Sequence, residues 1–359
     1  MTQDPPGLPL DALLQWLAAN VEDIDTSRSL EASLLTGGRS NLTYKVVDGA
    51  GRAWAVRRPP LGHVMPSAHD LGREARVLSG LGRGGYPVPA VRALCQDDAV
   101  IGVPFLVMDF IDGPVIADNA DARRLTAPQA DHVCSLLVES LARLHSLDAQ
   151  AVGLGDFGRP GGYLARQVRR WGEQWSLSAT REVPAMDVMA AWLTDQVSAI
   201  PADLPWSIVH GDFRLDNVIL SPDLAEVRAV LDWEMSTLGD PVADLAVALV
   251  YWTEDADGLR GQVPVAQRLT AGPGFWTRSR IVDTYADLTG RDLAHLPFCL
   301  VLACYKLAVI MESLNFRNRM GMQLGRAAEP GEDTDAAVLA LARLGEKLVD
   351  RPEVATLSS

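Results

Sequence analysis

The spacing of apolar residues in the first third of the chain predicts a sheet preceded by a helix. Leucines three and four residues apart indicate an amphipathic helix over residues 9–20. Over residues 29–60 the pattern changes to short apolar runs separated by a glycine pair and by the sequence DGAG, and DG between β-rich runs is typical of a hairpin. A helical pattern over residues 67–81 and two strands within residues 88–110 follow. We therefore expect a mostly antiparallel sheet with one helix packed on it.

Beyond Gly113 the apolar residues recur mainly at helical spacing. Thr126 and Gln129 stand at the spacing of a capping box, a pattern that starts a helix. They open the first of four predicted helical segments: 126–148, 162–178, 188–200 and 276–349. Residues 227–252 add a short β segment that runs into a further helix. The predicted fold class is α+β, with a small, antiparallel β-rich N-terminal lobe and a larger, mainly helical C-terminal lobe.

Composition and charge exclude some classes of partner. The formal net charge of the 359 residues is −14, which disfavours non-specific nucleic-acid binding, because phosphate contacts need a basic surface. The N-terminus lacks a basic region followed by an apolar core, so no signal peptide is predicted. The longest apolar run, residues 296–305, is too short to span a bilayer and predicts a buried helix. We expect a cytoplasmic protein with no nucleic-acid or membrane partner; no feature indicates an oligomeric state.

The cysteines predict neither a disulfide framework nor a metal site. The four cysteines show no C-x-x-C spacing, and the six histidines do not form a recognisable cluster with them. We expect reduced thiols in or near the core.

The sequence IVHGDFRLDNVIL, residues 208–220, places two acids, an amide, a histidine and an arginine between two apolar runs. Asp212 and Asn217 are five residues apart, and Asp232 follows a second apolar strand, 227–231. If the two neighbouring strands pair as a hairpin, Asp232 returns beside the loop. Two carboxylates and an amide oxygen are hard ligands, and such ligands suit Mg²⁺.

These motifs resemble those of a known family. HGDFRLDN is similar to the H-G-D-x-x-x-x-N loop of the aminoglycoside phosphotransferase and choline kinase group, relatives of the protein kinases, and LDWE stands where protein kinases have D-F-G. Together with GGRSNLTY, VRRPP, REARVL and DWEMSTLGDPVADLA, they resemble the kinase-like domains found with acyl-CoA dehydrogenases, over residues 10–345. The resemblance implies a bilobal protein-kinase-like fold, with a nucleotide-binding lobe over residues 1–113 and a catalytic and substrate-binding lobe over residues 114–359.

The resemblance also implies roles for the residues of the loop. Asp212 would be the catalytic base, Asn217 and Asp232 would be Mg²⁺ ligands, and His210 would support the loop. Asp240 and Asp244 could bind metal, but Asp240 precedes a proline at a helix start, and an aspartate in this part of the fold usually braces the catalytic loop. We therefore expect structural roles for both.

Nucleotide-binding residues are implied in the N-terminal lobe. Ser40 and Asn41 would belong to the loop that covers the nucleotide, and the backbone of Asp109, Phe110 and Ile111 would contact adenine.

The lysine that kinases of this fold use to hold phosphates is missing from the third strand. Arg57 stands in its place, on the same strand face as Ala55, and arginine can grip phosphate oxygens with two bonds. Glu74, on the following helix, is the expected partner that orients Arg57. Lys45, on the preceding strand, is the alternative cation.

The function implied is transfer of the γ-phosphoryl group of ATP, with Mg²⁺, to the hydroxyl of a small molecule. The acceptor pocket is expected among residues 163–176, 251–280 and 300–322. An acidic stretch, residues 254–257, would suit a cationic acceptor, whereas arginines near residues 170 and 317 would suit an anionic one, such as a hydroxyacyl thioester. The rival classes are a pseudokinase that binds nucleotide without transfer, and a protein kinase, which the lack of an A-P-E-like segment after Asp232 disfavours.

Overall fold

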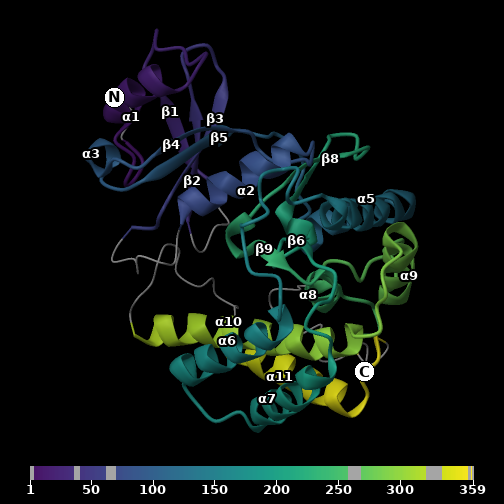
Figure 1. Ribbon diagram of the computed structural model, residues 1–359. Coiled ribbons are helices and arrows are strands. Elements are labelled where there is room, and N and C mark those ends of the chain that lie inside the picture. Colours follow the sequence, from purple (N-terminus) through teal and green to yellow (C-terminus); the bar gives the residue numbers. More distant parts are fainter. Residues whose placement is uncertain are drawn as a thin grey trace. The chain divides into compact units, whose positions relative to one another are not determined.

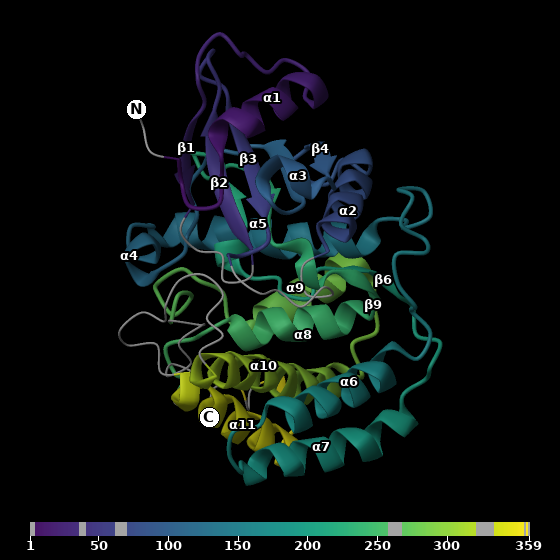
Figure 2. The same ribbon diagram turned by 90° about the vertical axis from the view of Figure 1, so that its left-hand side faces the viewer.

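The computed structural model describes residues 4–35, 41–61, 70–257, 268–320, 334–354 and 357. These residues form two compact units (Figures 1 and 2). The first contains the described residues up to Asp112 together with Ala229–Glu234, and the second contains the others, from Gly113 onward. The short segment Ala229–Glu234 therefore belongs to the first unit, although it lies within the predicted C-terminal lobe.

The first unit is built on a five-stranded sheet in the order β1-β2-β3-β5-β4, with every neighbouring pair antiparallel. Its elements are α1 (Leu10–Asn20), β1 (Glu31–Leu34), β2 (Leu42–Val47), β3 (Ala53–Arg58), α2 (Leu71–Arg83), β4 (Val91–Cys95), α3 (Asp98–Ile101) and β5 (Phe105–Asp109). The predicted sheet and both long helices are confirmed. The four-residue α3 was not predicted, because one turn is too short to show a helical period; Asp97 caps it by accepting the N–H of Ala99 at 2.9 Å.

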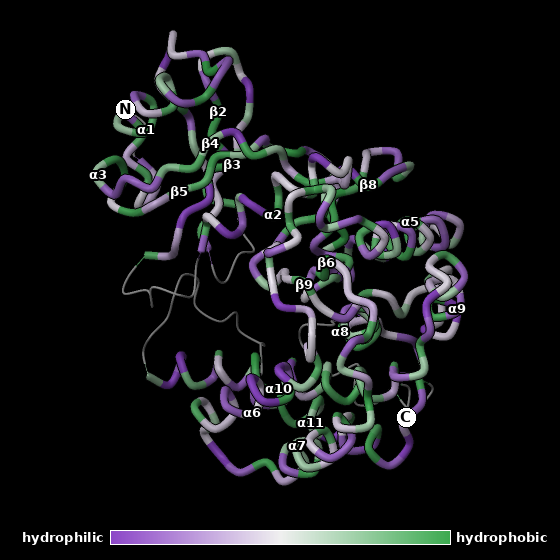
Figure 3. Tube along the Cα trace, viewed as in Figure 1, coloured by the Kyte–Doolittle hydropathy of each residue, from purple (hydrophilic) through white to green (hydrophobic). Residues whose placement is uncertain are grey.

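Alternating residues of the strands are buried on opposite faces of this sheet. One face packs against α1 in a cluster that includes Leu13, Val56 and Phe105, all fully buried. The opposite face carries Ala55 and Arg57, and α2 lies on that side. The interior strand β5, between β3 and β4, is almost wholly apolar, and the hydrophobic colouring in Figure 3 reflects this. The period of two therefore fixes which face of the sheet the charged Arg57 occupies.

The second unit is mainly helical. Its elements are α4 (Asn119–Ala122), α5 (Ala127–Ser146), α6 (Tyr163–Ser178), α7 (Pro184–Gln196), η1 (Val197–Ala199), β6 (Ser207–Val209), η2 (Leu215–Asn217), β7 (Val218–Leu220), β9 (Thr237–Gly239), α8 (Pro241–Tyr251), α9 (Arg278–Thr289), α10 (Leu296–Arg319) and α11 (Thr334–Asp350). At the start of α5, the Thr126 N–H donates to Oε1 of Gln129 at 2.9 Å, so the predicted capping box is present.

Short strands surround the motif near residue 210. β6 pairs with β9, and β7 pairs with β8 (Val227–Val230), as the predicted hairpin requires; η3 (Trp233–Met235) follows β8. β9 was not predicted, because its three residues lie between a 3₁₀ turn and a helix, where no alternation can develop. Together these pairings hold both ends of the loop that joins β6 to β7.

Helix α10 lies between α8 on one side and α6 and α11 on the other (Figure 2). By length and composition alone this 24-residue helix could cross a membrane, but 78% of its most apolar window is buried against the rest of the protein. The prediction of a buried helix is confirmed. The statement that the apolar stretch is too short to span a bilayer was wrong, because the helix continues past Lys306 to Arg319.

Candidate active site

The loop between β6 and β7 is fixed by a buried carboxylate. Asp244, in the first turn of α8, accepts the N–H of His210 at Oδ2 and the N–H of Gly211 at Oδ1, both at 2.7 Å. Nε2 of His145 lies 3.1 Å from the same Oδ2. Burial alone would raise the pKa of Asp244, but its hydrogen bonds with His145 and His210 hold that pKa below its ordinary value. The structural role predicted for Asp244 is confirmed.

His145 completes this buried network. Burial lowers the pKa of its imidazole, so the ring is neutral. A neutral imidazole has one N–H donor. If Nε2 donates to Asp244, Nδ1 is the atom that accepts the hydrogen bond from the Tyr285 hydroxyl at 2.6 Å. His210 is also fully buried, and its Nδ1 accepts the N–H of Asp212 at 3.1 Å. Both histidines therefore satisfy polar groups around the loop, which is the supporting role predicted for His210.

Asp212 is held in place but stays open to a reactant. The Tyr251 hydroxyl donates to its Oδ1 at 2.8 Å, Nε of Arg214 lies 3.6 Å from its Oδ2, and the side chain is 22% exposed. Burial, and next the charge of Asp212, raise the pKa of Tyr251 well above its ordinary value, so Tyr251 remains a donor. The partly exposed carboxylate therefore stays accessible to the hydroxyl of a reactant.

Two residues next to Asp212 were missed from the sequence. Tyr251 is at the far end of α8, and Lys306 is in the middle of α10, where its Nζ donates to the carbonyl of Gly211. Burial lowers the pKa of Lys306, and the charge of Asp212 works in the opposite direction. The one available signal was Lys306 itself, a cation in the middle of a long, mainly apolar helix.

Asn217 has the orientation that a metal ligand needs. Its Nδ2 donates to the backbone carbonyl of Asp212 at 3.0 Å, and the residue is 8% exposed. Because this bond uses the amide nitrogen, the amide oxygen is the end left to coordinate a cation, and it is a hard ligand of the kind that Mg²⁺ takes. The side chain of Asn217 therefore fits the predicted role, which stays a prediction.

In the first unit, Arg57 is the centre of a cluster of carboxylates. Its Nε lies 3.1 Å from Glu74, and its Nη2 lies 3.0 Å from Asp232 and 3.7 Å from Glu234. The predicted pairing with Glu74 is present. Arg57 is 14% exposed at its side chain, so it is not a surface residue of the strand. One guanidinium therefore contacts three carboxylates, whose oxygens are hard ligands of the kind that Mg²⁺ takes.

In this cluster, burial and the neighbouring charges have opposite effects on the pKa values of Arg57 and Glu74. Burial works against the charge on Arg57, but Glu74 and Asp232 outweigh it and raise the pKa of Arg57. Burial raises the pKa of Glu74, and Arg57 offsets this only in part. Asp232 has a left-handed backbone, with φ at 65°, and its side chain is 36% exposed. A carboxylate held in a strained turn and open to solvent fits a cation ligand.

The other residues predicted to bind nucleotide are only partly described. Ser40 lies outside the described residues, and Asn41 is buried directly before β2. The N–H of Asp109 donates to the carbonyl of Ala90 at 2.9 Å, so this N–H is already used in a backbone hydrogen bond and is not available to adenine. Lys45 lies 4.4 Å from the centre of the Phe110 ring. No further partner defines roles for Phe110 and Ile111, which remain predictions.

Asp240 caps α8, as predicted: its Oδ1 accepts the N–H of Val242 at 2.8 Å. Its Oδ2 contacts Nε2 of His295, also at 2.8 Å, so the carboxylate joins the starts of α8 and α10.

The acidic stretch that could have held a cationic acceptor has another role. Arg278 is 1% exposed, its N–H donates to Glu254 at 2.7 Å, and its guanidinium contacts both Glu254 and Asp257. These two carboxylates neutralise a buried arginine, so they do not form the cation site considered from the sequence.

An apolar cavity adjoins the loop in the second unit. Apolar residues of α5 and α8, with Phe213 and Leu215 of the loop, form most of its wall, and its polar residues include Arg214, Asp216, Tyr251 and Thr270. Of the three ranges predicted to line an acceptor pocket, 251–280 contributes Tyr251, Trp252, Leu269 and Thr270, whereas 163–176 and 300–322 contribute no residue.

The sheet, the helical unit and the braced H-G-D-x-x-x-x-N loop define a kinase-like α+β protein. The phosphotransferase enzyme family matches residues 31–280, and the chain belongs to this family. A solved structure from Ralstonia eutropha, provisionally assigned as an aminoglycoside phosphotransferase, has 31% identity and a TM-score of 0.76, covering 95% of this chain and 98% of that one. The predicted family and fold are confirmed.

Two curated relatives indicate the range of the family. Acyl-CoA dehydrogenase family member 11 of Gallus gallus is 34% identical over 90% of this chain, which spans 41% of that protein. Homoserine kinase of Caulobacter sp. is 26% identical over 71% of this chain and 75% of its own length. The chain thus spans less than half of the length of the acyl-CoA dehydrogenase relative.

Gly211 should tolerate no side chain. Its φ is +84°, and an added Cβ would lie 2.7 Å from the carbonyl oxygen of Met235. We expect Gly211→Ala to lower the free energy of unfolding by more than the roughly 1–2 kcal/mol of left-handed strain alone. Gly290→Ala is the matched control, because its φ is +63° and no heavy atom lies within 4 Å of the added carbon. Urea denaturation compares the two; equal losses would contradict this account.

Proposed function

We propose that the protein transfers the γ-phosphoryl group of ATP to the hydroxyl of a small molecule in a Mg²⁺-dependent reaction. The observation that carries the proposal is the position of Asp212: a partly exposed carboxylate on a loop whose backbone is bound by Asp244. Family membership supports phosphoryl transfer. Positioning and electrostatics supply most of the rate in this chemistry, so a rigid loop suits it.

Asp212 acts as the base. Oδ1 is occupied by the Tyr251 hydroxyl, which leaves Oδ2 to accept the proton of the acceptor hydroxyl. The hydroxyl oxygen then bonds to the γ-phosphorus as the bond to the bridging oxygen of ADP breaks, and the proton remains on Asp212 until solvent removes it. Arg214, beside Asp212, places positive charge next to the reacting groups.

Asn217 and Asp232 supply oxygen ligands for Mg²⁺ in this proposal. When bound, Mg²⁺ neutralises charge on the phosphates. The chain's own contribution is to orient the Asn217 amide through the Asp212 carbonyl and, before nucleotide binds, to hold Asp232 against Arg57.

Arg57 holds phosphate oxygens, and Glu74 fixes its direction. The guanidinium has several donors in one plane, so Nε can stay on Glu74 while the others turn from Asp232 to a phosphate. Asn41, with Ser40, and the backbone near Phe110 and Ile111 complete the nucleotide contacts.

A hydroxyacyl thioester is the second candidate acceptor, beside a polar alcohol such as the substrate that homoserine kinase is named for. The apolar cavity next to the loop, with Arg214 at its polar part, favours an acceptor that has an acyl chain and negative charge. The acyl-CoA dehydrogenase relatives agree with this choice. An amino sugar is disfavoured because Glu254 and Asp257 are committed to Arg278.

The direct experiment is a phosphoryl-transfer screen with Mg-ATP against hydroxyacyl thioesters, amino alcohols and aminoglycosides. Phosphorus NMR should show a phosphoester formed in step with ADP. Binding of Mg-ATP without a phosphoester from any acceptor would favour the pseudokinase alternative and contradict the proposal.

Asp212→Asn should lower turnover about 10²–10⁴-fold, because the amide cannot accept the proton. The fold and nucleotide affinity should be retained, since the Tyr251 hydroxyl can still donate to the amide oxygen. Steady-state kinetics test this, with Asp223→Asn on an exposed turn as the control. Near-normal turnover of Asp212→Asn would remove Asp212 as the base.

Arg57→Ala should weaken Mg-ATP binding at least about 10-fold and leave adenosine binding little changed, because charge-assisted phosphate bonds are lost. It should also destabilise the fold, since Glu74 becomes a buried carboxylate without its cation. Arg57→Lys should recover part of the affinity, because lysine restores the positive charge but not the planar guanidinium that forms two parallel hydrogen bonds with a phosphate. Calorimetric titration with both ligands is the test; an equal change for both would contradict a phosphate contact.

A further inference from the structure

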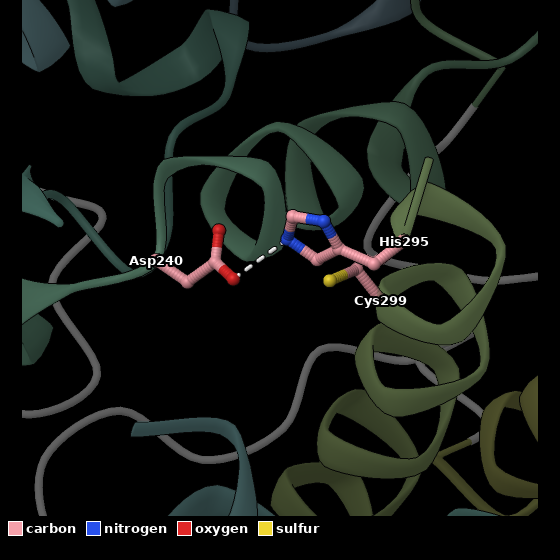
Figure 4. A group of neighbouring side chains, drawn as sticks. All are labelled: Asp240, His295 and Cys299. Atoms are coloured by element: carbon pink, nitrogen blue, oxygen red, sulfur yellow. Dashed lines mark hydrogen bonds and ion pairs between the residues drawn. The ribbon is translucent and has the colours of Figure 1, made fainter. Parts of the chain in front are cut away.

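Asp240, His295 and Cys299 form a second cluster of metal-binding side chains, separate from the residues assigned above to Mg²⁺ (Figure 4). One carboxylate oxygen, one imidazole nitrogen and one sulfur all lie within 4.8 Å of one another. Asp240 and Cys299 are buried and His295 is 14% exposed, so the cluster has one side near solvent. Within the described ranges, no other group of three such residues meets in this way.

The backbone explains why the three side chains converge. His295 is the N-cap of α10 and Cys299 is four residues later, so both project from the same face of the first helical turn. Asp240 is the N-cap of α8, which packs against α10. Its Oδ1 is held by the N–H of Val242, so Oδ2 is the oxygen that points to the other two residues (Figure 4). The sequence-based expectation that histidines and cysteines do not cluster was wrong here, because the carboxylate comes from a distant segment.

We propose that these three residues bind a thiophilic divalent cation, with Zn²⁺ as the best match. A carboxylate, an imidazole and a thiolate are all ordinary Zn²⁺ ligands, whereas Mg²⁺ avoids sulfur. Tetrahedral bonds of about 2.0–2.3 Å require ligand atoms about 3.3–3.6 Å apart, so the side chains need to move by about 1 Å. Three protein ligands leave a fourth position for water on the exposed side.

The thiol is what distinguishes this cluster from an ordinary hydrogen bond between Asp240 and His295. A structural contact needs no sulfur next to it, and a buried thiol without a metal behaves as a small apolar side chain. Zn²⁺ binds the thiolate form of cysteine, so the cation must displace the proton of the Cys299 thiol. Affinity should therefore fall as the pH is lowered.

The location gives the ion a structural consequence. It would join the starts of α8 and α10, the two helices that supply Asp244 and Lys306 to the loop of Asp212. Binding to the folded state alone raises stability, so the melting temperature should increase with Zn²⁺.

The test is titration of the metal-free, reduced chain with Co²⁺ as a spectroscopic probe, followed by displacement with Zn²⁺. The wild-type protein should bind one equivalent with a thiolate-to-cobalt charge-transfer band, and Zn²⁺ should remove the band and raise the melting temperature. Cys299→Ser should abolish the band. Both Cys299→Ser and His295→Asn should lower Zn²⁺ affinity by more than about 10-fold, because mutation of a residue that merely hydrogen-bonds to a metal ligand already lowers affinity by about that factor. Cys304→Ser, on the same helix, is the matched control and should keep both properties.

Melting curves without metal separate loss of the site from loss of the fold. A wild-type chain that shows no thiolate band, or a Cys299→Ser variant that is folded and binds Zn²⁺ as tightly as wild type, would overturn the proposal. Neither result would bear on phosphoryl transfer, because no ligand of this site is assigned to that reaction.

Discussion

The contact on which the rest of the site depends is the pair of hydrogen bonds from the N–H groups of His210 and Gly211 to Asp244. A buried carboxylate is stable only when its oxygens are satisfied, and these bonds, with His145, satisfy both. In return they fix two successive peptide groups directly before Asp212. Removing one partner of such a buried charge typically costs about 3–5 kcal/mol, so the loop and the core are stabilised together.

Around this anchor, polar groups are divided between holding the loop and leaving atoms for ligands. Tyr251 takes one oxygen of Asp212, and the Asn217 amide nitrogen takes a carbonyl, so one oxygen of each side chain is left. In the other unit, Arg57 contacts three carboxylates. The remaining oxygen of Asp212 is left for a proton and that of Asn217 for a cation, as the proposed phosphoryl transfer requires.

Much of this could be predicted from the sequence, because its signals are local. The period of two placed Arg57 on its strand face, the capping box began α5, and the spacing of Asp212 and Asn217 identified the loop. The sequence could not predict contacts that join segments far apart in the chain. These contacts are those of Tyr251 and Lys306 with the loop, and the group of Asp240, His295 and Cys299. The short α3 and β9 were missed because they are shorter than the period that would reveal them.

Amide hydrogen exchange, followed by NMR, tests most directly whether the loop is preorganised before any ligand binds. The amides of His210 and Gly211 should exchange as slowly as those of the buried helix α8, through global unfolding, because both bond to a buried carboxylate. Rapid exchange of these two amides, at the rate of an exposed loop, would contradict the claim that Asp244 holds the loop in position for the reaction.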